Sequence, residues 1–156
     1  QSFTLAVDQL VEMREREGKE LASLLDSRLV DIETTVEKLR EETPAIIAHQ
    51  HEKLLKRLDD IDVEVEQGRV EQELVILAQK LDVAEELDRL VTHVLEVRRN
   101  LKADEPVGRR LDFLMQELNR EANTLSSKAA ATSTTMQAVD LKVSIEQMRE
   151  QIQNIE

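Results

Sequence analysis

The chain has 156 residues, enough for one domain or for a compact unit with a long arm. It contains no Cys, Trp or Tyr and only two Phe, so disulfides and thiolate metal sites are excluded and the core must be aliphatic. The formal net charge of −12 argues against nonspecific nucleic-acid binding and gives no reason to expect DNA, because phosphate contacts need local cations.

The remaining composition is typical of long helices or coiled coils. Charged residues make up 35% of the chain, and there are only three Gly and two Pro. We see no long apolar run and no signal peptide, so we expect a cytoplasmic protein without a membrane span. The chain begins at Gln1 rather than Met, and we therefore expect a fragment of something longer.

Apolar residues recur at helical spacing over 7–42 and again over 45–67. The dipeptide Thr43-Pro44 lies between the two runs and reads as a stop and restart, because Pro is tolerated in the first turn of a helix. The sequence thus predicts that residues 1–68 form an antiparallel helical hairpin, an arm of about 35 Å for its shorter helix.

Residues 69–156 are expected to form a C-terminal helical domain. Helices are predicted over 69–81, from about 82 to 101, from 108 to about 128, and over 136–155, with a loop at 103–108. The predicted fold class is all-α, a long antiparallel helical hairpin arm followed by a small helical bundle.

The helix that begins at Gly108 carries two stripes. One is apolar and has the spacing of a buried face. The other is polar, with Arg120 beside it, and comprises Asp112, Gln116, Asn119 and Asn123. Asn and Asp are poor helix formers, so this stripe predicts either contact with a polar partner or a buried amide network between packed helices.

A second polar row lies on the preceding helix. Asp82, Glu86, Arg89 and His93 fall within about 60° of one another at 100° per residue. Carboxylates with an imidazole are ligand types for Mn²⁺ or Mg²⁺, and an arginine beside them can hold a phosphate. The alternative is a solvated face with i,i+4 ion pairs, which on spacing alone is the commoner case.

Arg109 and Arg110 stand at the start of a predicted helix, where the helix dipole disfavours cations. The pair therefore points to an anionic partner, either RNA phosphate or an acidic arm of a neighbouring subunit.

Four segments carry a resemblance to a known family. They are RVEQEL at 69–74, EELDRLVTH at 85–93, VGRRLDFLMQELNRE at 107–121, and EQMREQIQNIE at 146–156. In these segments the chain resembles YicC/YloC-type proteins of bacteria, densely after residue 69 and loosely in the arm. The resemblance implies a stress-induced, metal-dependent endoribonuclease that favours manganese, assembles as a hexamer and has a separate N-terminal domain that this chain lacks.

The resemblance also implies roles for individual residues. The catalytic candidates are Glu86, His93, Glu117 and Glu121. The metal candidates are Glu85, Glu86, His93 and Asp112, with Mn²⁺ favoured over Mg²⁺. The RNA-binding candidates are Arg89, Arg109, Arg110, Gln116, Asn119, Arg120 and Asn123. The alternative is a non-catalytic RNA-binding adaptor or a structural helical protein that assists another RNA-decay enzyme.

Overall fold

The computed structural model describes residues 2–60, 66–103, 105–129 and 134–153. Nearly all of these residues lie in helices, and no strand occurs among them. The helices are α1 (Ser2–Asp59), α2 (Gln67–Leu81), α3 (Ala84–Leu101), α4 (Gly108–Ala129) and α5 (Thr135–Gln153). The predicted all-α class is confirmed.

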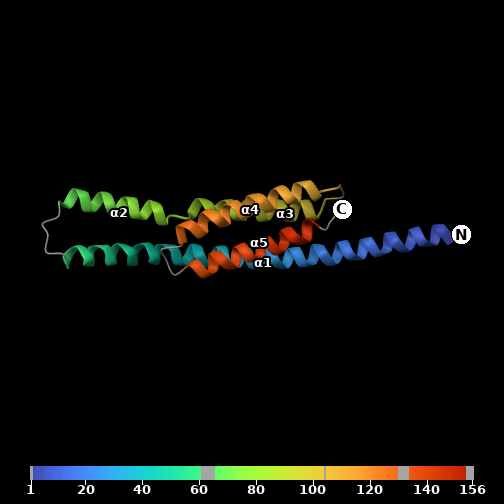
Figure 1. The fold of residues 1–156 in the computed structure, drawn as a ribbon, viewed down its shortest axis with the longest axis horizontal. Coiled ribbons are helices and arrows are strands. Elements are labelled where there is room, and N and C mark those ends of the chain that lie inside the picture. Colours follow the sequence, from blue (N-terminus) through green and yellow to red (C-terminus); the bar gives the residue numbers. More distant parts are fainter. Residues whose placement is uncertain (1, 61–65, 104, 130–133, 154–156) are drawn as a thin grey trace.

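The molecule is elongated, with a bundle in its middle (Figure 1). Helix α2 runs back beside the last part of α1 and forms a two-helix arm with it. Helices α3 and α5 pack against the middle of α1, α4 packs on α3 and α5, and the first part of α1 projects beyond them. A helical hairpin followed by a bundle, as predicted, is therefore the architecture, but α1 belongs to both parts.

The predicted helix break at Thr43-Pro44 is wrong. Helix α1 continues through Pro44. It has 58 residues in all and is about 87 Å long at 1.5 Å per residue. The chain reverses beyond Asp59, so α2 takes the place that we had expected for the helix over 45–67. An internal proline costs a helix about 3 kcal/mol, and the apolar stripe of α1 runs across it, with Leu39 buried before it and Ile47 half-buried after it.

The core of the bundle is a single aliphatic cluster from α1, α3, α4 and α5. Its residues on α1 and α5 alternate spacings of three and four, which keeps one seam of each helix turned toward its neighbours. On α1 these are Leu25, Leu29, Ile32, Val36 and Leu39, and on α5 they are Ala138, Leu141, Ile145, Met148 and Ile152. The core thus includes residues on both sides of residue 68.

Side-chain bonds between helices fix their register. Arg98 of α3 donates to Asp26 at 2.8 Å and to Glu33 at 2.6 Å, both on α1. These bonds, the one to Asp26 foremost, raise the pKa of Arg98 above its usual value, so the guanidinium stays charged. Arg40 of α1 donates to Asp88 of α3 at 2.7 Å. Helices α1 and α3 are therefore bonded at two levels along the bundle.

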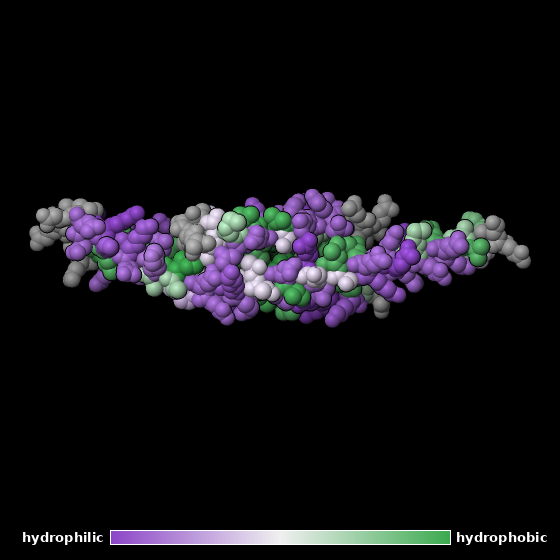
Figure 2. All heavy atoms as spheres, turned by 90° about the horizontal axis from the view of Figure 1, so that it is seen from below, coloured by the Kyte–Doolittle hydropathy of each residue, from purple (hydrophilic) through white to green (hydrophobic). Residues whose placement is uncertain are grey.

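The surface is mostly hydrophilic between scattered apolar side chains (Figure 2). Apolar side chains are also exposed where α1 projects past the bundle, among them Phe3, Leu5 and Leu10. Within the described residues, no helix combines the length and the apolar character that crossing a bilayer requires.

Candidate functional site

Three potential metal ligands converge between α3 and α4. His93 of α3 faces Glu117 and Glu121 of α4, and one ligand atom from each lies within 4.8 Å of the others. Glu117 and Glu121 are one helical turn apart, so both carboxylates reach the same side of α4. An imidazole nitrogen and two carboxylate oxygens are a donor set that suits a hard divalent cation.

Glu121 is the buried member of this group, with 3% of its surface exposed. It borders the apolar stripe of α4, and Leu118, Ala122 and Leu125 around it are buried too. A buried carboxylate needs a compensating partner. Arg89 supplies it, because its Nη1 donates to Glu121 Oε1 at 3.3 Å.

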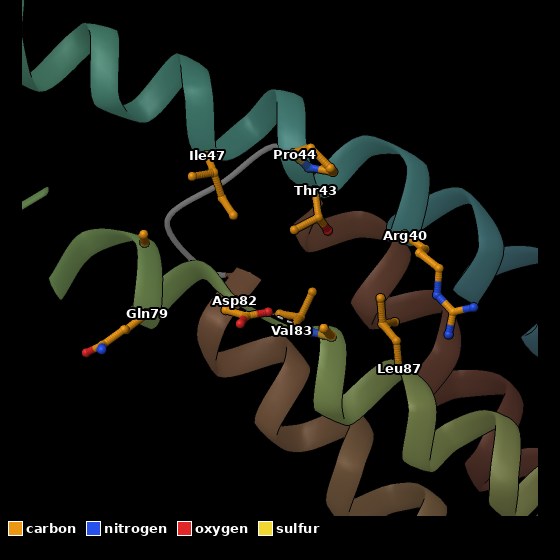
Figure 3. A pocket seen from close by; sticks show the side chains of 10 residues that line it. Arg40, Thr43, Pro44, Ile47, Gln79, Asp82, Val83 and Leu87 are labelled. Carbon is orange, nitrogen blue, oxygen red and sulfur yellow. Dashed lines mark hydrogen bonds between the residues drawn. The ribbon is translucent and has the colours of Figure 1, made fainter. Parts of the chain in front are cut away.

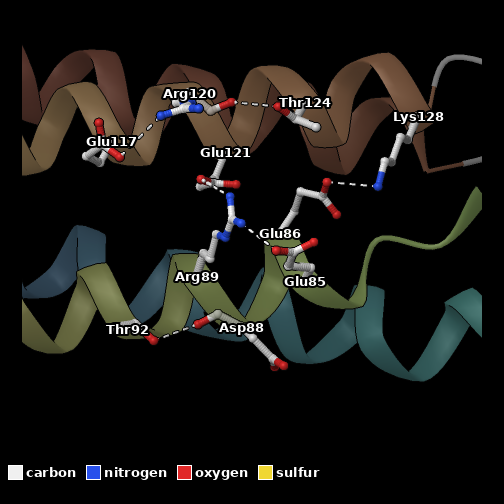
Figure 4. Close-up of polar contacts among 10 residues, drawn as sticks. All are labelled: Glu85, Glu86, Asp88, Arg89, Thr92, Glu117, Arg120, Glu121, Thr124 and Lys128. Atoms are coloured by element: carbon white, nitrogen blue, oxygen red, sulfur yellow. Dashed lines mark hydrogen bonds and ion pairs between the residues drawn. The ribbon is translucent and has the colours of Figure 1, made fainter.

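Arg89 bridges the two helices (Figure 4). Its second amino group donates to Glu85 on α3, one turn before it. The hydrogen bond to Glu121 and then the charge of Glu85 raise the pKa of Arg89, so it stays a cation. The side chain of Arg89 is half exposed.

Glu86 has a different partner. Its Oε1 lies 2.8 Å from the Nζ of Lys128, near the end of α4, and Lys128 also donates to the backbone carbonyl of Asp82 at 2.7 Å. Lys128 is not among the residues predicted for the site from the sequence. Glu86 is 7% exposed, and its Oε2 has no hydrogen-bond partner among the described residues. This pair ties the start of α3 to the end of α4.

Of the four predicted metal residues, the convergent group contains only His93. Glu85 pairs with Arg89, Glu86 pairs with Lys128, and Asp112 accepts a bond from Gln116 at 2.8 Å on its own helix. Asp112 precedes Glu121 by nine residues, about 13 Å along α4. The structure therefore does not bring Asp112 to His93, whereas it does bring the predicted catalytic residues Glu117 and Glu121 to it.

The predicted amide stripe lies on another side of α4. Gln116 bonds to Asp112, and Asn123 donates to Asn119 at 3.4 Å, each one turn away on the same helix. At 100° per residue these side chains point 100° to 160° away from Glu117. Gln116 and Asn123 are exposed, so among the described residues this stripe is no buried network between helices.

The predicted arginines are spread along the same pair of helices. Arg89 joins the convergent group, and Arg120 lies 3.9 Å from Glu117 beside it. Arg110 lies 3.7 Å from Glu96 at the loop end of the bundle, and Arg109 is exposed next to it.

A cavity of about 560 Å³ opens where α2 leaves the bundle (Figure 3). Apolar side chains such as Pro44, Ile47 and Leu87 line it, with Arg40 at one side. Its one carboxylate is that of Asp82, which already accepts the backbone N–H of Ala84 at 3.0 Å and thereby caps the start of α3. The cavity offers no donor set comparable to that of His93, Glu117 and Glu121.

The fold and the site define an all-helical protein that groups an imidazole, two carboxylates and a guanidinium between two antiparallel helices. The family model described as "Endoribonuclease YicC-like, C-terminal" matches residues 39–156. The chain belongs to this family of YicC-like endoribonucleases.

Two relatives carry the name "Probable endoribonuclease YicC". The protein from Haemophilus influenzae is 50% identical over 155 residues, which cover 99% of this chain and 54% of the relative. The protein from Clostridioides difficile is 36% identical over 154 residues, which cover 97% of this chain and 53% of the relative. The chain thus spans about half the length of the curated relatives that it matches.

Proposed function

We propose that the protein is a metal-dependent endoribonuclease whose divalent ion is held by His93, Glu117 and Glu121. The observation that carries the proposal is the convergence of these three ligand types within 4.8 Å in a chain of an endoribonuclease family. No other group of three such side chains stands out among the described residues.

The residues fit such an ion by their chemistry. Two carboxylates and one imidazole favour Mn²⁺ or Mg²⁺, and the imidazole shifts the preference toward Mn²⁺. When bound, the ion lowers the pKa of a water molecule and polarises the phosphate. Arg89 neutralises part of the charge of Glu121 before any ion binds, so the two carboxylates can lie close together.

The three ligands differ in their access to solvent. The side chain of Glu117 is 25% exposed, whereas that of Glu121 is 4% exposed. A carboxylate that binds through one oxygen keeps its second oxygen as a hydrogen-bond acceptor. We therefore assign Glu121 to holding the ion, and Glu117 both to holding it and to taking a proton from the water that attacks the phosphorus. The P–O bond to one ribose oxygen breaks in this step, and that oxygen takes a proton from solvent. Arg89 lies beside Glu121, and we assign it to stabilising the charge of the phosphate in the transition state.

The test is cleavage of a labelled RNA hairpin by the full-length gene product, with Mn²⁺ and with excess chelator. We expect Mn²⁺-dependent cleavage, and a loss of about 100-fold or more in Glu121→Gln, the loss expected when a catalytic electrostatic contact is removed. Glu150→Gln, at an exposed position of α5, is the matched control and should cleave as the wild type does.

Each outcome has a distinct meaning. Cleavage that is unchanged in Glu117→Gln and Glu121→Gln would remove these residues from the site. RNA binding without cleavage by the wild type would favour the alternative, a non-catalytic adaptor that assists another nuclease. If the variants have a lower melting temperature but the same cleavage rate per folded molecule, the role of Glu117 and Glu121 is structural.

Assembly as a hexamer, cytoplasmic localisation and cooperation with other RNA-decay enzymes stay predictions from the family resemblance. Sedimentation velocity of the full-length gene product and of this chain tests the first of them. If both samples sediment as a single monomeric species, the expected oligomer is contradicted.

A further inference from the structure

The aromatic side chain of Phe113 is exposed beside the candidate site. The whole chain has two aromatic residues, and the other, Phe3, is at the opposite end of the sequence. Phe113 is 57% exposed, although Leu114 and Met115 next to it are buried in the core. More than half of this side chain is therefore accessible to a ligand.

The neighbours of Phe113 are cations on one side and the candidate site on the other. Arg109 and Arg110 lie four and three residues before it, and Glu117 lies four residues after it. Side chains at these spacings are neighbours on a helix surface. Along α4, Arg109, Phe113 and Glu117 therefore follow one another at about 6 Å intervals.

These cations are available to a ligand. Arg109 is exposed and forms no ion pair with any residue that the structure describes. Arg110 has 61% of its side chain exposed and lies only loosely against Glu96, at 3.7 Å. In a chain of net charge −12, two open arginines beside an exposed aromatic ring form a local site for an anion with a flat, apolar part.

A nucleotide has these two properties. We propose that Phe113 stacks on the base of an unpaired nucleotide whose phosphates contact Arg109 and Arg110, one helical turn from Glu117. Unpaired bases are read in this way, by stacking on aromatic side chains next to basic residues. A base inside a duplex has no free face, so the site selects RNA that is single-stranded next to the cut.

This inference rests on the proposed function for its substrate class, RNA. Its test is therefore made without metal, so that binding is measured apart from cleavage. The full-length gene product is titrated with a hairpin RNA in chelator, by fluorescence anisotropy. One abasic nucleotide is then moved through the unpaired loop of the hairpin.

For the wild type we expect one loop position at which loss of the base weakens binding by about 5- to 100-fold. Phe113→Ala should bind the intact RNA more weakly by a similar factor and should no longer respond to the abasic nucleotide. Phe113→Trp should keep the response. The matched control is Leu95→Ala, which removes another exposed apolar side chain, 53% exposed and on the far side of α3 from His93.

Two binding results would overturn the proposal: binding by the wild type that does not change with the abasic nucleotide, or the same abasic response in Phe113→Ala. A change in sedimentation coefficient for Phe113→Ala, with RNA binding intact, would also overturn it and would assign the ring to contact with a second copy of the chain. Failure of the proposed function gives a different result. If the wild type responds to the abasic nucleotide but does not cleave RNA with Mn²⁺, the stacking site is supported and the metal-dependent nuclease is not.

Discussion

Replacing Lys128 by Met tests whether Glu86 is a structural or a metal-binding residue. The change keeps most of the apolar stem and removes the cation that lies 2.8 Å from Glu86 Oε1. The carboxylate is then left 7% exposed, with no cation beside it and with an Oε2 that has no hydrogen-bond partner in the described part of the chain.

The magnitude follows from this burial. Breaking a fully buried ion pair by removing one partner costs about 3–5 kcal/mol. Here the side chain of Lys128 is 30% exposed, so water reaches the pair and we expect about 2 kcal/mol. For a chain of this size the melting temperature falls by about 2–4 °C per kcal/mol, hence by about 4–8 °C.

The assay is thermal and urea unfolding followed by helical circular dichroism. Lys142→Met makes the same chemical change at an exposed position of α5 and should lie within about 0.5 kcal/mol of the wild type. The double variant Glu86→Leu/Lys128→Met leaves no buried charge and should recover at least half of the lost stability.

The same double variant decides the role of Glu86. If Glu86 only fixes the helices, the double variant binds Mn²⁺ with the affinity of the wild type. Equal stability of Lys128→Met and Lys142→Met would refute the argument from burial. A folded double variant that has lost Mn²⁺ affinity would return Glu86 to the metal ligands that the sequence analysis predicted.

Three further predictions concern other positions. Pro44→Ala should raise the free energy of unfolding by about 1–3 kcal/mol, seen as a higher urea midpoint, because α1 regains a backbone hydrogen bond; a lower midpoint would show that the proline fits its helix without strain. Arg98→Met should lower the free energy of unfolding, measured in urea, by about 1–2 kcal/mol, because two carboxylates on α1 lose their partner. Arg99→Met removes only an exposed i,i+3 ion pair and should change this free energy by less than about 0.5 kcal/mol. Equal effects of the two substitutions would contradict the role of Arg98 in joining the helices. Arg89→Met leaves the buried Glu121 without its cation, so Mn²⁺ should raise the melting temperature of this variant more than that of the wild type, and an equal shift would separate Glu121 from the metal.

The helices of the bundle could be predicted from the sequence because their apolar stripes are regular. The loop before Gly108 and the turn at Asp82 followed from Pro, Gly and Asp at positions where a helix ends or begins. The continuity of α1 could not be predicted, because the local preference of Pro44 opposes it. The stripe packs into the core before Pro44 and beside α2 after it, and both contacts involve residues far away in the sequence.

The candidate site could be predicted only in part. The face of each helix follows from 100° per residue, which placed His93 on one polar row and Asp112 on another, whereas Glu117 and Glu121 were named only through the family resemblance. Which residues of the two rows meet depends on the register between α3 and α4. That register is set by the core and by contacts such as that between Glu86 and Lys128. Asp112 lies about 140° around α4 from Glu117, so which side of α4 faces His93 had to come from the structure.

The most direct test of the account is the position of the metal. A crystal of the protein soaked in Mn²⁺ and measured at a wavelength where manganese scatters anomalously shows where the ion binds. We expect an anomalous peak among His93, Glu117 and Glu121 that is absent from crystals of Glu121→Gln. A peak at Glu85, Glu86 or Asp112, or no peak in crystals of a protein that cleaves RNA with Mn²⁺, would contradict it.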